Sequence, residues 1–124
     1  MSIHGLSEEV VRECRFKLIE LKQDLLNRVR HAQNEFVSHE KTGDEVDLTV
    51  AQLEEHHFLI NQARLRHMLL EIESALSRIE QGTFGICEET EEPIEPDRLL
   101  TIPWTRLSIE GAEIREAMNR RYAR

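Results

Sequence analysis

The chain has 124 residues, of which 24 are acidic and 16 are basic, so its formal net charge at pH 7 is -8. A chain of this length fits one domain of ordinary size. Charged residues make up 32% and aromatic residues 5%, which is typical of long exposed helices and disfavours a compact, core-rich enzyme. The negative charge repels phosphate backbones, so we expect no direct sequence-specific DNA binding.

No apolar run approaches the ~20 residues that a membrane-spanning helix needs, and the first residues lack the pattern of a secretory signal. We therefore expect a cytoplasmic protein that does not interact with membranes. The two cysteines, Cys14 and Cys87, lie in very different contexts, which gives no support to a disulfide framework. Both are expected to be reduced thiols.

A first long helix is expected from Ser7 onward, because serine favours a helix start and no Gly or Pro follows until Gly43. Its apolar positions are spaced by three and four residues, as in the seam of a coiled coil. These positions are Val11, Cys14, Leu18, Leu21, Leu25, Val29, Ala32 and Phe36.

A second stretch without Gly or Pro runs from about Asp47 to Gln81, and Gly82 ends it. Its seam consists of Leu48, Ala51, Phe58, Leu65, Leu69, Ile72, Leu76 and Ile79. Two helices of ~34 residues would each extend about 50 Å. The short break between them predicts an antiparallel hairpin with an acidic tip near residues 43–48.

After the hairpin the sequence contains several prolines and glycines among scattered apolar residues. This composition predicts a small globular knob with short elements. A last helix is expected from about Ser108, with Ile109, Ile114 and Met118 on one side and arginines at its end. The fold class is therefore mainly α. Residues 1–82 form a long antiparallel coiled-coil hairpin, and residues 83–124 form the knob and a C-terminal helix.

The sequence FGICEET at residues 84–90, followed by Arg98-Leu99 and by SIEG at residues 108–111, resembles the finger of the DksA/TraR family of transcription factors. That family also carries an Asp-x-x-Asp pair at the tip of its helical hairpin, where this chain has Asp44 and Asp47. The resemblance covers roughly residues 44–115. It implies that the knob is zinc-finger-like.

The four zinc-ligand positions of the family are degenerate here, because they hold Cys87, Thr90, Ser108 and Gly111. A structural zinc site needs four thiolate or imidazole ligands. Hydroxyls are poor zinc ligands and glycine has no side chain, so we expect no metal in the knob. Apolar side chains would then hold it together, each contributing about 1.5–3 kcal/mol when buried. The candidates are Ile86, Ile94, Leu99, Ile102, Trp104 and Leu107.

Members of the family act on bacterial RNA polymerase: the hairpin enters the secondary channel and its acidic tip approaches the catalytic centre. The resemblance implies a non-enzymatic regulator of initiation, connected with the stringent response, that changes open-complex stability. Asp44 and Asp47 would be the tip acids, and Thr49 stands where the family often has a small residue. The alternative role for either Asp is to cap the second helix.

The response to the alarmone ppGpp is expected to be weak or absent. The positions at which responsive family members carry basic residues hold Glu71, Ile102 and Ala112. A polyanion gains nothing from these side chains. We therefore expect no cofactor. Arg98 matches the Arg-Leu of the family, and its structural alternative is pairing with glutamates of the knob.

Two other functions stay open. One is a generic coiled-coil interaction or oligomerisation protein, although a monomer is expected. Its exposed apolar candidates are Ile19, Leu26, Leu59 and Leu70. The other is a transcript-cleavage factor of the Gre type, which fits less well. Gre factors have an Asp-x-x-Glu tip followed by Asn, whereas Leu48 follows Asp47 here.

The histidines invite a metal interpretation. Glu54 and His57 resemble half of a di-iron carboxylate motif, but the second half is missing. A hairpin folded near Gly43 would bring His31 toward His56, which with a neighbouring glutamate is an adventitious zinc site. Solvated helix residues are the simpler interpretation.

Cys87 is also weighed as a reactive thiol. It has no basic neighbour in the sequence, and its neighbours Glu88 and Glu89 are expected to raise its pKa. A vestigial ligand position is therefore the favoured interpretation.

Overall fold

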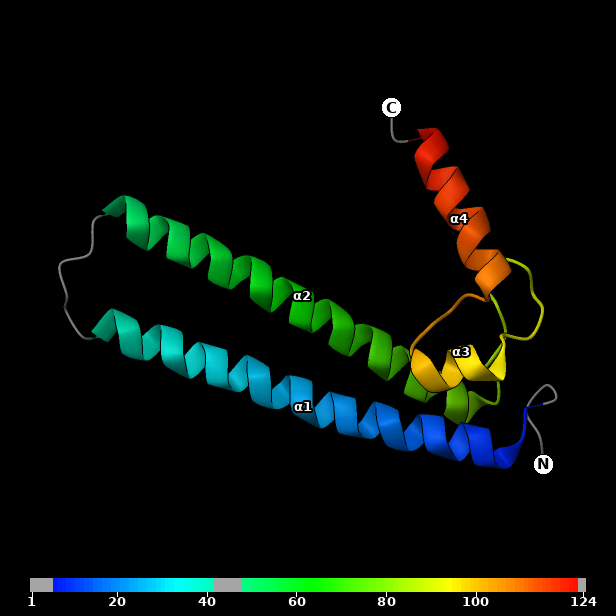
Figure 1. The fold of residues 1–124 in the computed structure, drawn as a ribbon. Coiled ribbons are helices and arrows are strands. Elements are labelled where there is room, and N and C mark those ends of the chain that lie inside the picture. Colours follow the sequence, from blue (N-terminus) through cyan, green and yellow to red (C-terminus); the bar gives the residue numbers. More distant parts are fainter. Residues whose placement is uncertain (1–5, 42–47, 123–124) are drawn as a thin grey trace.

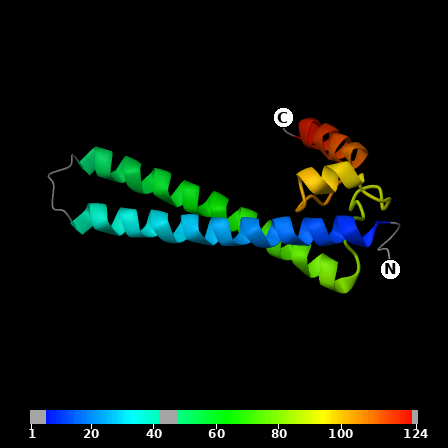
Figure 2. The same cartoon turned by 60° about the horizontal axis from the view of Figure 1, so that its bottom comes forward.

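The computed structural model describes residues 6–41 and 48–122, which form four helices: α1 (Glu8–Lys41), α2 (Leu48–Gln81), α3 (Pro96–Thr101) and α4 (Ile109–Tyr122). The long helices α1 and α2 lie side by side and antiparallel, and the short helices α3 and α4 gather at the end of the hairpin that is far from its tip (Figures 1 and 2). The predicted mainly α fold, with a coiled-coil hairpin and a small knob, is confirmed.

Local signals set the ends of the long helices. The Oγ of Ser7 accepts a hydrogen bond from the backbone N–H of Val10 (3.2 Å), which caps α1. At the end of α2, Gly82 adopts a φ of 77°, a left-handed conformation that favours glycine. The N–H of Thr83 then donates to the carbonyl of Arg78 (2.9 Å), so the chain turns sharply out of the helix.

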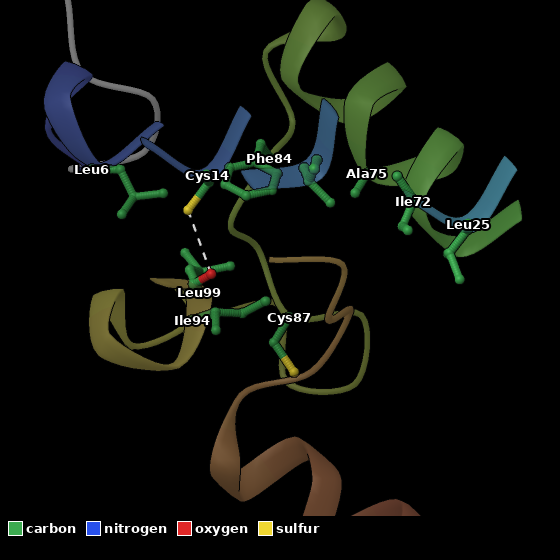
Figure 3. Close-up of a cluster of buried hydrophobic side chains, with 10 residues drawn as sticks. Leu6, Cys14, Leu25, Ile72, Ala75, Phe84, Cys87, Ile94 and Leu99 are labelled. Carbon is green, nitrogen blue, oxygen red and sulfur yellow. Dashed lines mark hydrogen bonds between the residues drawn. The ribbon is translucent and has the colours of Figure 1, made fainter. Parts of the chain in front are cut away.

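The core lies at the base of the hairpin and continues into the knob (residues 83–108). Cys14 and Leu18 of α1, Ile72 and Ala75 of α2, and Phe84 of the knob are each fully buried. Figure 3 shows these side chains together with others from the knob in one cluster. Burial of one such large side chain is worth about 1.5–3 kcal/mol.

The tip half of the hairpin (residues 29–41 and 48–62) has a thinner seam. Phe36 and Phe58 stack with ring centroids 4.3 Å apart. The expected seam positions Leu48 and Ala51 are exposed instead, the first at 72%. Gln62 is buried at 4% exposure, where the sequence pattern indicated no seam residue.

The knob is built from a turn, a bridge and a short helix. Ile86 and Pro93 form an antiparallel β-bridge, and Pro96 begins α3. Ile94 and Leu99 are buried, whereas the other expected apolar supports of the knob are half-buried: Ile86, Ile102, Trp104 and Leu107.

Two hydrogen bonds join α3 to α1, in addition to the apolar core that the knob shares with the hairpin. The Nζ of Lys17 donates to the carbonyl of Leu100 (2.8 Å), and the thiol of Cys14 donates to the carbonyl of Leu99 (3.4 Å; Figure 3).

Several apolar side chains of the hairpin are exposed to solvent. Ile19, Leu59 and Leu70 are exposed, and Leu26 is half-buried, which leaves the last of these partly within the seam. No helix within residues 6–41 and 48–122 is both long enough and apolar enough to cross a membrane.

Candidate functional site

The four degenerate ligand positions come together in the knob around the sulfur of Cys87. Ser108 Oγ donates a hydrogen bond to Cys87 Sγ (3.4 Å), and the backbone N–H of Thr90 donates to the same sulfur (3.5 Å). The N–H of Gly111 donates to Ser108 Oγ (3.0 Å), which makes Ser108 the cap of α4. Figure 3 shows the side chain of Cys87 pointing toward the chain that leads into α4.

Gly111 has no side chain, and the sulfur of Cys87 occupies the space that a side chain would need. A Cβ atom built at this position would lie 2.4 Å from Cys87 Sγ and 3.3 Å from Ser108 Oγ. A real Cβ never approaches sulfur so closely, so the loop around Cys87 and the start of α4 are in direct contact. The missing side chain at position 111 is therefore part of the packing of the knob.

The pKa of the Cys87 thiol is lowered, which corrects the expectation from sequence. Burial raises this pKa, but hydrogen bonds from Ser108 and Thr90 to the sulfur outweigh burial and lower it from 9.0 to about 6. Glu88 and Glu89 were expected to raise it. In the structure their carboxylates are instead engaged by arginines of the knob and of α4.

This arrangement does not fit a zinc ion. The site supplies one thiol, Cys87, while Thr90 and Ser108 offer neutral hydroxyls and Gly111 has no side chain. The amide of Thr90 donates to the sulfur and its hydroxyl accepts from the N–H of Glu92 (3.3 Å), and the Thr90 side chain also helps to lower the pKa of Cys87. Four side-chain donors arranged as a tetrahedron, which zinc requires, are not present at these positions.

The histidines that the structure describes do not assemble into a metal site either. His31 pairs with Glu35 on its own helix (Nε2 to Oε1, 3.1 Å), and both side chains are exposed. Glu54 and His57 remain half of a motif on the exposed surface of α2. Across residues 6–41 and 48–122, no group of three or more His, Cys, Asp or Glu side chains is placed to hold a metal ion.

Charged side chains surround the sulfur cluster and connect it to the hairpin. Arg106 Nε pairs with Glu71 of α2 (2.9 Å), and its Nη1 pairs with Glu88 beside Cys87 (2.9 Å). Arg115 of α4 pairs with the other oxygen of Glu88 (3.4 Å) and with Glu89 (3.1 Å). Sequence reasoning missed both arginines as structural residues. Their only signal was basic charge in an acidic segment.

Arg98 takes a different partner from the one expected. Its Nε donates to the backbone carbonyl of Leu107 (2.8 Å), so it holds the chain that leads into α4.

Two of the three positions weighed for an alarmone response line one groove. Glu71 and Ile102 lie along a groove of about 310 Å³ between α2 and the knob, together with Trp104, Arg106 and Arg115. Both arginines are engaged by glutamates, so their charge is already partly neutralised.

The structure describes only part of the predicted tip of the hairpin. Asp44 and Asp47 lie outside the described residues. Thr49 lies in the first turn of α2 and is exposed.

Comparisons with known proteins found relatives of the C-terminal part and of most of the chain. The model of the prokaryotic dksA/traR C4-type zinc finger matches residues 82–117. The RNA polymerase-binding transcription factor DksA of Caulobacter vibrioides is 33% identical over 84% of this chain and 74% of its own length. General stress protein 16O of Bacillus subtilis is 23% identical over 86% of this chain and 69% of that protein.

Solved structures resemble the whole arrangement. Transcription factor DksA2 from Pseudomonas aeruginosa matches with a TM-score of 0.84 and 32% identity, over 92% of this chain and 88% of that one. The RNA polymerase binding protein and transcriptional regulator Dks from Chlamydia trachomatis matches with a TM-score of 0.53 and 22% identity, over 91% of this chain and 94% of that one. The second likeness bears on the fold alone.

Proposed function

Because the chain belongs to the DksA/TraR family, we propose that it is a cytoplasmic, non-enzymatic regulator that binds bacterial RNA polymerase. The observation that carries this proposal is 33% identity, over 84% of the chain, with an RNA polymerase-binding transcription factor. The hairpin supports a mode of action through the secondary channel, since each 34-residue arm extends about 50 Å.

In this proposal the acids Asp44 and Asp47 act at the tip, with Thr49 beside them on α2. Carboxylates in a confined, cation-rich channel engage basic side chains or the surroundings of a catalytic magnesium ion. The free energies involved are small, because ~1.4 kcal/mol changes the population of an initiation intermediate tenfold. The protein acts as a monomer and does not read DNA sequence.

In vitro transcription with purified bacterial RNA polymerase tests this proposal. The variants are the double variant Asp44→Asn, Asp47→Asn and a matched control, Glu45→Gln, which removes one neighbouring charge. We expect wild type and control to bind and to change open-complex lifetime, and the double variant to bind without effect.

Two outcomes overturn the proposal. If wild type does not bind polymerase, the family likeness concerns fold and ancestry only, and an oligomerising coiled-coil protein takes its place. Sedimentation would then give a mass above that of one chain. If wild type shortens transcripts in the presence of magnesium, the protein is a cleavage factor.

We also propose that the knob is folded without metal, because its donors do not form a zinc site. The melting temperature of the purified protein should not change with a strong chelator, and its zinc content should be far below one ion per chain. A matched control is the variant Thr90→Cys, Ser108→Cys, Gly111→Cys, which restores four thiols. It should bind zinc and become sensitive to the chelator once the start of α4 shifts to make room for the new Cβ at position 111. Stoichiometric zinc in the wild type would contradict the proposal.

The proposed regulator responds weakly or not at all to ppGpp. Glu71 repels a polyanion, and its pairing with Arg106 occupies the arginine nearest to it. Open-complex lifetimes measured with the wild-type protein, with and without ppGpp, should therefore agree within error. A strong additional effect of ppGpp would contradict this part of the proposal.

A further inference from the structure

The position of α4 depends on a few side chains near its start. Figure 1 shows α4 projecting away from the hairpin. Gly111 is the buried residue of this helix, and Ala112 and Arg115 are half-buried. Every residue from Glu116 to Tyr122 is exposed. Contacts at or before Arg115 must therefore fix the direction in which the rest of α4 points.

Five charged residues, which we call the ion-pair network, join α2, the knob and α4. They are Glu71, Glu88, Glu89, Arg106 and Arg115. Glu88 is the central member, because one of its oxygens pairs with Arg106 (2.9 Å) and the other with Arg115 (3.4 Å). The network thus runs without interruption from the hairpin to the first turns of α4.

The hairpin end of the network is held firmly. Arg106 Nε and Nη2 contact the two carboxylate oxygens of Glu71 at 2.9 and 3.4 Å, which is a bidentate pair. Nη2 also donates to Ser74 Oγ (2.9 Å), and the backbone N–H of Glu88 donates to the carbonyl of Arg106 (2.9 Å). Arg106 is therefore fixed by α2 on one side and by the knob on the other.

The α4 end of the network is more accessible to salt. The side chain of Arg115 is 42% exposed, against 31% for Arg106. Its partners Glu88 and Glu89 are 39% and 26% exposed, against 25% for Glu71. Dissolved ions weaken exposed ion pairs, because the electrostatic screening length of the solution falls from ~8 Å at physiological ionic strength to ~3 Å at 1 M. Salt should therefore release Arg115 before it releases Arg106.

We infer that the ion-pair network fixes the direction of α4 relative to the hairpin, so that α4 is held at low ionic strength and freed at high ionic strength. The loop at residues 87–90 and the start of α4 at residues 108–111 are the two segments that four metal-bound thiolates would crosslink. Here the pairs of Arg115 with Glu88 and Glu89 contribute to that connection. The hydrogen bond from Ser108 to Cys87 and the packing of Gly111 on the same sulfur also contribute, and the carboxylate of Glu95 accepts from the N–H of Ile109 (3.2 Å). This inference does not depend on the proposed function.

The distance between α2 and α4 in the full-length protein tests the inference. Nitroxide labels are attached at Glu80→Cys on α2 and Asn119→Cys on α4, both exposed positions, while the native Cys14 and Cys87 are buried. Pulsed electron spin resonance then measures the distribution of distances between the labels. We expect a narrow distribution at low salt and a broad one in 1 M salt, with unchanged helical circular dichroism.

Charge-removing variants separate the network from a general effect of salt. Glu88→Gln and Arg115→Gln, which keep the length and shape of the side chain, should broaden the distribution already at low salt. Arg120→Gln, a matched change on the exposed part of α4, should leave it narrow. A distribution that stays narrow in 1 M salt and in Glu88→Gln would overturn the inference, and so would equal broadening by Arg120→Gln.

Discussion

Cys87 illustrates how the fold changes the titration of one side chain. Its folded pKa of about 6 lies below the value of 9.0 for a free thiol, so between these two pH values the unfolded chain binds more protons than the folded chain. The stabilising contribution is complete above pH 9 and is lost as the pH falls through 6. We expect the free energy of unfolding to rise across this window, and to rise less in Cys87→Ser.

Urea unfolding at several pH values measures this effect, and Cys14 provides the control. Burial raises the pKa of the Cys14 thiol to about 11, so this thiol stays protonated throughout the same window. Cys14→Ser should therefore lower stability by a similar amount at each pH. Parallel pH profiles for wild type and Cys87→Ser would show that the hydrogen bonds to Cys87 do not favour its thiolate.

Replacing Gly111 by alanine is expected to lower stability, although the same change usually stabilises a helix. Replacing glycine by alanine inside a helix normally stabilises it by about 1 kcal/mol. Here the new Cβ would lie 2.4 Å from Cys87 Sγ, so we expect Gly111→Ala to destabilise the protein by about 1–3 kcal/mol. In a Cys87→Ala background the collision is removed and the same change should become neutral or stabilising. A double-mutant cycle by urea unfolding measures the difference.

At the scale of helices, the sequence predicts the features that depend only on residues close in sequence, such as the ends of helices. Ser7 and Gly82 mark ends of the long helices through local hydrogen bonds and backbone conformation, so both boundaries could be predicted. Side-chain burial depends also on the facing helix. The seam pattern therefore succeeds at the base, around Leu18 and Ile72, and fails at Leu48 and at the buried Gln62.

The tip half of the hairpin is expected to open more readily than the base. Its seam relies on the stacked rings of Phe36 and Phe58, whereas the fully buried apolar residues of α1 and α2 lie toward the base. Phe58→Ala should weaken the tip half by about 1–3 kcal/mol. Amide hydrogen exchange should then accelerate in residues 29–41 and 48–62 while the base stays protected. Phe16→Ala, at a site 62% exposed, is the control and should change neither half.

Across the whole molecule, the sequence predicts which residues of the knob lie close together, but it does not predict the ion pairs that join the knob to the hairpin. The four degenerate positions are close in the fold, as their family spacing implied. The pair between Glu71 and Arg106 joins residues 35 positions apart, and no local pattern specifies it. Such pairs follow from the way the knob rests on α2, which is a tertiary property. The same is true of the space at Gly111.

The knob and the base of the hairpin share one core, so they should unfold together. Leu99 of α3 is fully buried in the cluster that also contains Leu18 and Ile72. Truncating it removes contacts from both parts, and Leu99→Ala should cost about 2–5 kcal/mol. Trp104 is the single tryptophan and reports on the knob by fluorescence, while circular dichroism reports mainly on the hairpin. We expect Leu99→Ala to shift both transitions by the same amount. If fluorescence shifts and circular dichroism does not, the knob is an independent unit that only rests on the hairpin.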